Sequence, residues 1–188
     1  MLKKFLVACV LGLALVGPAA ATSVLPLQLD EIIDTATTVF EGTCIDNRTE
    51  RELATNLVVT YTTFAVKDVL KGTVQGATHV IKQIGGKMPG SELSFSVHGV
   101  PTFAVGESYV VFLAGVSSAG FSSPIGLGQG KFSVLQDASG VRVTNGRDFR
   151  DMTARMPSVV LPGTAAPVPH LGLDDFKQLV RTRVGSLK

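Results

Sequence analysis

The sequence is short of cysteine, with two cysteines in 188 residues, at positions 9 and 44. Cys9 lies in an N-terminal segment that we expect to be removed, so Cys44 stands alone in the expected mature chain. One cysteine cannot form an internal disulfide, and the fold must therefore rest on packing. Cys44 shares a strand face with Phe40, and we expect it to be buried and inert; the alternative is a thiol that reacts or pairs with another chain.

The sequence also lacks an excess of charge of either sign. Residues 1–21 hold two of the 17 Lys and Arg and none of the 15 Asp and Glu, so 15 of each sign remain. A neutral chain without basic clusters argues against nucleic acid and anionic membrane surfaces as partners. Beyond the N-terminus, no apolar run has the length of a membrane span, and Tyr109–Val116 is only as long as a strand.

Residues 1–21 read as a secretory signal peptide. Lys3 and Lys4 precede an apolar run, and Ala19 and Ala21 have the spacing of a signal-peptidase site, which predicts cleavage after Ala21. The protein is therefore expected in the periplasm or outside the cell. An uncleaved anchor is one alternative. Lipidation at Cys9 is another, although most of the apolar run follows this cysteine, whereas a lipid-bearing cysteine should come after the run.

Residues 22–154 show short strand patterns separated by turn signals. This pattern of short strands and turns is typical of a mainly β fold, and we predict a small antiparallel OB-like β-barrel as one domain. The last two strand patterns are expected to form a hairpin. The expected strands are 37–45, 57–72, 77–84, 91–98, 108–113, 130–137 and 141–145.

The strongest strand signal is residues 57–72, which are dense in β-branched and aromatic side chains. Its alternation places Thr60 and Thr62 on the same face as Phe64. The polar stretch 44–56 before it is expected to be a loop. This stretch contains a glycosylation sequon at Asn47, which has meaning only in a eukaryotic secretory host.

Helices are expected at the two ends of the domain. A short helical segment comes before the strands, and residues 173–188 form an amphipathic helix that we expect to dock on the barrel. The segment 155–172 between barrel and helix holds four of the nine prolines and should run extended. A partner-binding helix on a proline tether is the alternative. The apolar stripes are Leu29, Ile32, Ile33 and Ala36 in the first helix, and Leu173, Phe176, Leu179 and Val180 in the second.

The glycine-rich stretch 126–132 resembles a phosphate-binding loop at first sight. A P-loop would need glycine at Ile125 and Ser or Thr at Phe132, and a dinucleotide loop would need glycine at Lys131. The segment that follows is a predicted strand, whereas both motifs require a helix. We therefore expect no nucleotide cofactor, and assign these glycines to a bend or a close backbone approach.

The residues that could ligate a metal or catalyse a reaction are few. His79, His98 and His170 show no metal-ligand spacing, and we expect no metal or other cofactor. Cys44 with His79 or His98 is the available cysteine–histidine combination, and no G-x-S-x-G elbow occurs. We therefore expect a protein that is not an enzyme, while a hydrolase with an unrecognised site stays open as an alternative.

Three stretches resemble a known module: 64–72 (FAVKDVLKG), 99–103 (GVPTF) and 106–113 (GESYVVFL). Over about residues 36–143 the chain is similar to bacterial exported proteins with an OB-like barrel related to the netrin module of tissue inhibitors of metalloproteinases. The resemblance implies the barrel and export. Those inhibitors bind the protease zinc through an N-terminal cysteine, whereas Thr22 is the predicted mature N-terminus, so the resemblance does not carry over that mechanism.

The resulting hypothesis is an exported, non-catalytic binding module whose partner is a protein. An inhibitor or accessory factor of an exported protease, acting through loop 85–94, is the alternative from another class. The candidate partner-binding residues are Pro101 and Phe103, as an exposed apolar patch, and Lys87 and Met88 in the loop. Ordinary turn and core packing is the competing interpretation of Pro101 and Phe103.

Overall fold

The computed structural model describes residues 25–92, 94–138, 140–156, 161 and 166–187. The predicted signal peptide, and residues 157–160 and 162–165 of the proline-rich segment 155–172, lie outside the described residues. Within the described part, no helix is long and apolar enough to cross a membrane.

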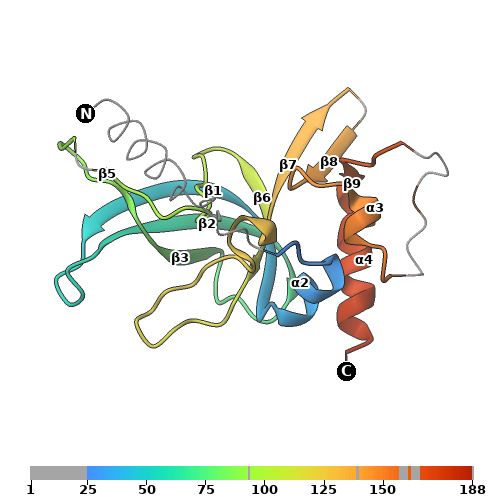
Figure 1. Cartoon of the computed structure of the whole chain (residues 1–188), viewed down its shortest axis with the longest axis horizontal. Coiled ribbons are helices and arrows are strands. Elements are labelled where there is room, and N and C mark those ends of the chain that lie inside the picture. The colour runs from blue at the N-terminus through green and yellow to red at the C-terminus, as the bar shows by residue number, and fades with distance from the viewer. Residues whose placement is uncertain (1–24, 93, 139, 157–160, 162–165, 188) are drawn as a thin grey trace, which may run out of the picture.

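The main element is a seven-stranded antiparallel sheet with the order β3-β2-β1-β6-β7-β8-β9 (Figure 1). A separate two-stranded ladder joins β4 (Gly86–Lys87) to β5 (Ser94–Phe95). The expected β7–β8 hairpin is present. The strands of the main sheet are β1 (Thr38–Arg51), β2 (Val58–Lys71), β3 (Thr78–Ile84), β6 (Ser108–Leu113), β7 (Lys131–Asp137), β8 (Gly140–Thr144) and β9 (Leu171–Gly172).

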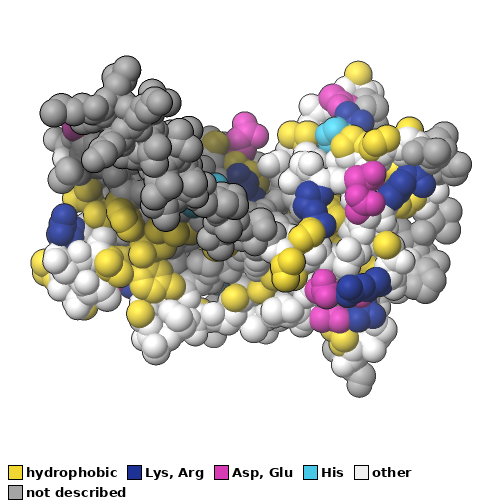
Figure 2. All heavy atoms as spheres, viewed as in Figure 1, with side chains coloured by type: hydrophobic (Ala, Val, Ile, Leu, Met, Phe, Trp, Pro, Cys, Tyr) yellow, Lys and Arg dark blue, Asp and Glu magenta, His cyan; other side chains and the backbone are white. Residues whose placement is uncertain are grey.

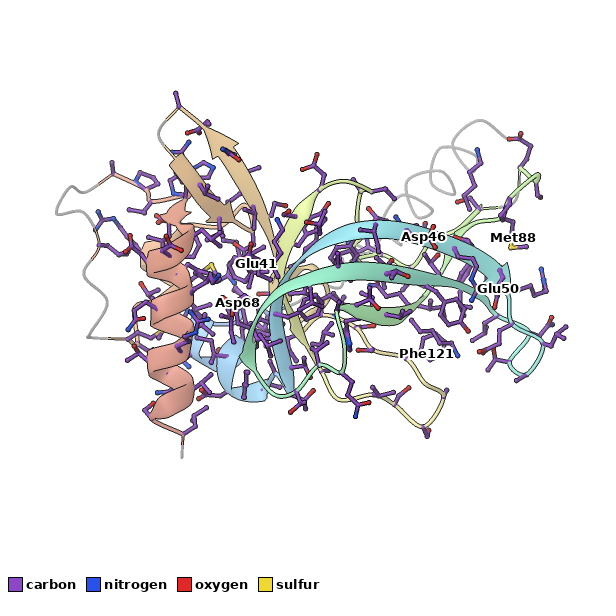
Figure 3. The ribbon with its side chains drawn as sticks, turned by 180° about the vertical axis from the view of Figure 1, so that it is seen from behind. Glu41, Asp46, Glu50, Asp68, Met88 and Phe121 are labelled. Carbon is purple, nitrogen blue, oxygen red and sulfur yellow. The ribbon has the colours of Figure 1, made fainter. Side chains whose placement is uncertain are left out.

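The prediction of a mainly β fold with a short N-terminal helix and a C-terminal helix is confirmed, but the sheet does not close into a barrel. β1 and β2 arch strongly along their length (Figure 3). In the described residues β3 ends the sheet, and it meets the loop after β6 through the Ser122 N–H, which donates to Lys82 O at 3.0 Å. One loop contact thus stands where a closed barrel would have a strand ladder.

Three register shifts in the β1–β2 ladder explain the arch of the two strands; the first two leave an extra residue in β2 and the third leaves one in β1. They lie between Val39 and Phe40, between Glu41 and Gly42, and between Cys44 and Asp46. A β-bulge adds an unpaired residue, bends its strand and changes which face the following side chains occupy. After the third shift, Asn47 and Thr49 therefore lie on the concave face that Cys44 occupies.

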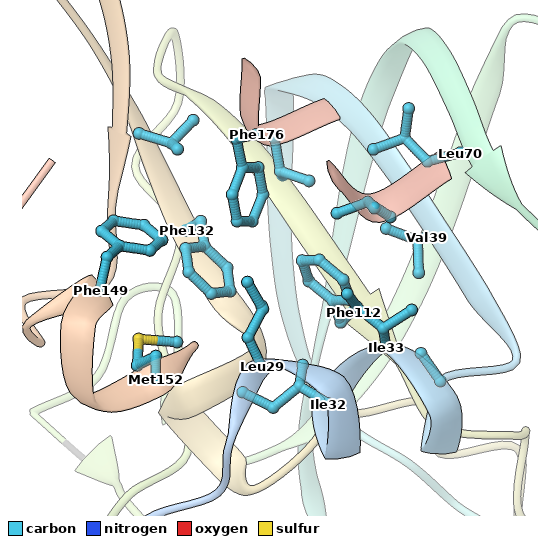
Figure 4. Close-up of a cluster of buried hydrophobic side chains, with 14 of the residues drawn as sticks. Leu29, Ile32, Ile33, Val39, Leu70, Phe112, Phe132, Phe149, Met152 and Phe176 are labelled. Atoms are coloured by element: carbon cyan, nitrogen blue, oxygen red, sulfur yellow. The ribbon is translucent and has the colours of Figure 1, made fainter. Parts of the chain in front are cut away.

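Two groups of buried side chains fill the molecule. The first lies inside the arch, where Phe40, Phe64, Phe103 and Tyr109 meet edge to face with ring centroids 5.0–6.5 Å apart, and Cys44 is fully buried among them. Edge-to-face pairs add to the hydrophobic gain of burial. The second lies between the sheet and the helices and is built around Phe112, Phe132, Phe149 and Phe176 (Figure 4).

The predicted helices have the predicted buried faces. In α2 (Leu29–Thr35) the apolar stripe is buried, and α4 (Leu173–Gly185) inserts Phe176 and Val180 into the second core. Docking of the C-terminal helix on the sheet is therefore observed. A four-residue helix, α3 (Phe149–Met152), was not expected; the Asp148 carboxylate caps it by accepting from Arg150 N at 3.0 Å.

Ion pairs fasten α4 to the long strands. Lys177 Nζ lies 2.8 Å from Glu41 Oε2 and 2.5 Å from Asp68 Oδ2, and Arg181 lies 2.7 Å from Asp68 Oδ1. Glu41 and Asp68 lie together at the end of the arch beside this helix (Figure 3), and charged side chains gather over the same half of the molecule (Figure 2). The side chains of Lys177 and Glu41 are almost buried, so the loss of either would leave the other charge buried without a partner.

Two expectations from the sequence differ from the structure. β1 continues to Arg51, so the predicted loop 44–56 is mostly strand; pairing with β2 gives its polar residues hydrogen-bonded neighbours. The alternating stretch 91–98 contributes just Ser94 and Phe95 to a ladder, because its partner is the two-residue strand β4. The alternation correctly indicated an extended chain, but it carried no information about a neighbouring strand.

The Asp68 ion pairs predict a pH-dependent stability. Burial raises the pKa of the Asp68 carboxyl, but hydrogen bonds from Lys177 and Arg181 lower it more, so the net shift is downward. The carboxylate therefore stabilises the fold above the ordinary Asp pKa, near 4, and this contribution disappears as the pH falls through the lowered value. We expect Asp68→Asn to cost about 1–2 kcal/mol of unfolding free energy at pH 7 and progressively less below pH 4.

Urea unfolding of both proteins from pH 7 to pH 2.5 measures this difference. Leu179→Ala on the same helix is the control, because its loss of packing involves no titrating group and should stay constant over the same range. A constant difference for Asp68→Asn would contradict the prediction.

Candidate functional site

A pocket of about 350 Å³ lies at the end of the arch away from α4. Its floor is the concave face of three adjacent strands, where the register places Thr49, Thr60 and Gln83 in one row across the sheet. The next row toward the core contributes Asn47 and Thr62. We call the five side chains Asn47, Thr49, Thr60, Thr62 and Gln83 the pocket floor. The inside of the arch is thus apolar at one end and polar at the other.

Three segments cover this floor. We call residues 85–87 and 94–97 the roof; they include the β4–β5 ladder, which lies at the end of the molecule opposite α4 (Figure 1). Residues 100–103 form a wall. Ile84, Val97, Val100 and Pro101 give the upper part of the pocket an apolar surface above the polar floor.

Two consecutive glycines bring the roof onto the floor. Gly85 and Gly86 have φ values of 96° and 136°, a region that favours glycine. A Cβ atom at Gly86 would lie 2.2 Å from Thr60 Oγ1 and 2.6 Å from Thr49 Cγ2. The Gly-Gly pair therefore serves two purposes: it turns the chain after β3, and it allows the backbone to pass directly over the two threonines.

The hydroxyl protons of the floor threonines are already used within the protein. Thr60 Oγ1 donates its one proton to Gly85 O at 2.6 Å, so Thr49 must be the donor in the 2.9 Å contact between Thr49 Oγ1 and Thr60 Oγ1. Thr62 Oγ1 donates to Asn47 Oδ1 at 2.7 Å. All three hydroxyl oxygens can therefore only accept a further hydrogen bond.

The wall is held rigidly by three polar contacts. Asn47 Nδ2 donates to Phe103 O at 2.7 Å, Lys131 Nζ donates to Thr102 O at 2.6 Å, and Ala104 N donates to the Tyr109 hydroxyl at 3.0 Å. The Lys131 ammonium also lies 4.8 Å from the centre of the Tyr109 ring, and burial lowers its pKa. The wall is thus fixed before any ligand arrives.

Gln83 is the exception to this satisfied network. The residue is 4% exposed, it lines the pocket, and its Nε2 atom has no hydrogen-bond partner among the described residues. A buried amide N–H without a partner costs about 1–3 kcal/mol. Buried polar groups are almost always paired, and Gln28 Oε1 and Arg142 Nε are the other buried side-chain atoms of the described residues without a partner. Of the three, Gln83 is the one that lines the pocket.

The structure places three of the four candidate residues at this pocket. Lys87 in the roof and Pro101 in the wall line it. Met88 follows Lys87 at the same end of the molecule (Figure 3). Phe103 is 4% exposed and its ring lies in the first core, so it contributes its backbone to the wall and is not an exposed apolar anchor. Loop 85–94 and segment 101–103, which the sequence suggested as two separate candidate surfaces, contribute to one site.

The pocket floor itself was missed in the sequence. Thr60 and Thr62 were placed correctly on the face of Phe64. Threonine is common in strands, so its presence there does not by itself indicate a site. Asn47 lay in a predicted loop. Gln83 carries the one available signal, a polar residue near the end of a predicted strand and two positions before Gly85-Gly86.

Two other candidate chemical groups, the Cys44 thiol and the His79 ring, lie in apolar surroundings, whereas His98 is exposed. Cys44 is fully buried, and burial raises the pKa of its thiol, which disfavours the nucleophilic thiolate. His79 packs edge to face on Phe40 at 5.2 Å, and burial lowers its pKa. No group of three His, Cys, Asp or Glu side chains that could hold a metal ion occurs in the described part of the chain.

The glycine-rich stretch 126–132 has the backbone role expected for it. Residues Leu127–Gly130 form a short 3₁₀ helix that leads directly into β7 rather than into an α-helix. A Cβ atom at Gly130 would lie 2.8 Å from Ile125 N and 3.0 Å from Phe112 O. Gly130 therefore permits the close backbone approach that was predicted.

No family model, curated protein or solved structure matches this chain. The resemblance to the netrin module accordingly remains a prediction, and the site must be interpreted from its own geometry.

Replacement of Gln83 tests the unpaired amide. We expect Gln83→Met to raise the free energy of unfolding by about 1 kcal/mol, because the apolar side chain of similar shape removes a buried donor without a partner. Thr62→Val is the matched control with the opposite sign. It should cost about 1 kcal/mol, because it leaves Asn47 Oδ1 without the hydrogen bond that it accepts. Urea unfolding measures both, and a loss of stability in Gln83→Met would show that the amide is satisfied.

Replacement of Gly86 tests the contact between roof and floor. Gly86→Ala forces a methyl group against Thr60, whereas Gly90→Ala, also at a positive φ, places its methyl group where no atom lies within 4 Å. We expect the Gly86 variant to lose about 2 kcal/mol more than the Gly90 variant. Equal losses in thermal or urea unfolding would mean that the roof does not rest on the floor.

Proposed function

We propose that this protein is an exported, non-catalytic binding module and that the pocket under the β4–β5 roof receives its partner. The observation that carries the proposal is the unpaired Gln83 amide on a floor whose threonine hydroxyl protons are already donated, beside a wall held by hydrogen bonds. A site prepared in this way gains affinity, because little conformational entropy is lost when the partner binds.

The chemical groups in the pocket favour binding over catalysis. Among the described residues that line it, the floor consists of neutral amides and hydroxyls, and Lys87 is the ionisable residue. General acid–base and nucleophilic catalysis both need a positioned group that titrates or is activated. The floor hydroxyls lack a neighbouring base, since their protons go to Gly85 O, to a second threonine and to an asparagine amide.

Export is supported by the N-terminal sequence. The two lysines, the apolar run and the Ala-x-Ala spacing in residues 1–21 support cleavage after Ala21 and a periplasmic or extracellular location. The remaining thiol, Cys44, is buried, which suits an oxidising compartment because an inaccessible thiol does not take part in disulfide exchange.

A protein partner is favoured by the apolar rim of the pocket. Phe95 is 45% exposed and Val97 is 36% exposed, and both line the site. Exposed apolar side chains around a recess are typical of a surface that another macromolecule covers. Phe95 belongs to a ladder held to β4, so the rim is presented in a defined position.

The protease-inhibitor alternative rests on the same hairpin. Residues 86–92, with β5, project at one end of the molecule (Figure 1), and Lys87, Pro89 and Gly90 in this segment are exposed. A projecting loop on a rigid base is the shape that enters a protease cleft. This function would use the tip of the hairpin, whereas the binding module uses the pocket beneath it.

Site-specific photocrosslinking tests the proposed function. A photoreactive amino acid replaces Phe95 at the rim, and in a control protein it replaces Val141, which is 40% exposed on β8 at the far side of the molecule. In the native host we expect one saturable adduct from position 95 and none from position 141. Excess unmodified protein should compete the adduct away.

Mass spectrometry of the adduct identifies the partner. Adducts of equal yield from both positions, or none from position 95, would overturn the proposal. If the partner is a protease, an inhibition assay decides between the pocket and the hairpin tip, since Pro89→Ala, at an exposed residue that does not line the pocket, should weaken inhibition through the tip alone.

A further inference from the structure

The pocket floor has a defined set of unused hydrogen-bonding groups. The protons of Thr49, Thr60 and Thr62 are all donated within the protein, so their oxygens offer lone pairs but no donors. Gln83 Nε2 has two N–H groups and no partner among the described residues. The row Thr49, Thr60 and Gln83 therefore presents acceptors beside a free donor on adjacent strands.

A complementary ligand group must bring an acceptor and a donor side by side. An amide does this, because its carbonyl can accept from Gln83 while its N–H donates to a threonine oxygen. The match belongs to the orientation of the Gln83 amide in this structure, because a reversed side chain would add a third acceptor to the row and leave the ligand carbonyl without a donor.

The charge and polarity of the pocket lining narrow the classes of ligand group that could bind. No floor side chain is ionisable, and Lys87, the lysine of the roof, is exposed, so a carboxylate on the floor would be desolvated without a partner. Sugars also combine donors and acceptors, but their remaining hydroxyls would lie against Ile84, Val97 and Pro101 and lose hydrogen bonds to water. An uncharged amide suits the polar floor, and an apolar group next to it suits the apolar upper part of the pocket.

We propose that the pocket recognises an uncharged amide of a polypeptide, with its carbonyl on Gln83 Nε2, its N–H toward the floor threonines and the adjoining apolar side chain under Phe95 and Val97. This inference rests on the proposed binding function and names its ligand class. The volume of about 350 Å³ lies at the lower end of the range for ligand sites and suits a single residue of an inserted segment.

Small isosteric probes test the amide preference directly. The isotope-labelled exported chain is titrated by NMR with isovaleramide, with isovalerate, which has the same shape but a carboxylate, and with glucose. We expect saturable millimolar shifts with isovaleramide at the Gln83 side-chain NH₂ and at the Thr60 and Thr102 backbone amides. Isovalerate should bind at least about tenfold more weakly, and the Val141 amide should not move.

The Gln83→Met variant supplies the second measurement. It should bind isovaleramide about tenfold more weakly than the wild-type protein does, whereas Thr55→Val, on the loop after β1, should leave the affinity unchanged. Equal affinity for the amide and the carboxylate, tighter binding of glucose, or unchanged affinity in Gln83→Met would each overturn the amide assignment.

The failure of this inference is distinguishable from that of the proposed function. A partner crosslinked through position 95 together with no isovaleramide shifts would leave the binding module in place and remove the amide as its ligand group. Isovaleramide binding without a position-95 adduct would retain the amide pocket and remove the macromolecular partner.

Discussion

The structure depends on the pairing of β1 with β2. This ladder joins fourteen-residue strands, and its register decides both the curvature of the sheet and which side chains face inward. The shift between Cys44 and Asp46 is decisive, because it keeps Asn47 and Thr49 on the inner face after Cys44. The extra residue is Ile45; with a regular register Asp46 and Arg48 would face inward, and the polar end of the arch would lose two of its five floor residues.

The arch separates two kinds of stabilisation. Near α4, buried aromatic rings tie helix to sheet, and Lys177, Arg181 and Arg183 each lie beside a carboxylate. At the other end, neutral hydroxyls and amides form a short relay that finishes at Gly85 O. Near α4, side chains are removed from solvent, and their burial stabilises the fold. The polar end retains one unsatisfied donor, which is the kind of local cost expected at a site that acts on something else.

Much of the fold could be predicted from periodicity. The strand 57–72 and the stripes that include Ile32 and Phe176 were found because burial repeats every two residues in a strand and every 3.6 in a helix. The pocket could not be predicted in this way. It depends on a bulge that shifts the alternation by one residue, and on long-range register that brings Gln83 beside Thr60, and neither leaves a periodic signal.

Phe103 belongs to two parts of the molecule at once. Its ring packs against Phe64 and Tyr109 in the core, while its carbonyl receives the Asn47 amide at the pocket wall. A ligand that holds this wall in place must therefore hold an aromatic ring in the core as well. Binding in the pocket would therefore raise the melting temperature of the whole fold and not of the pocket wall alone.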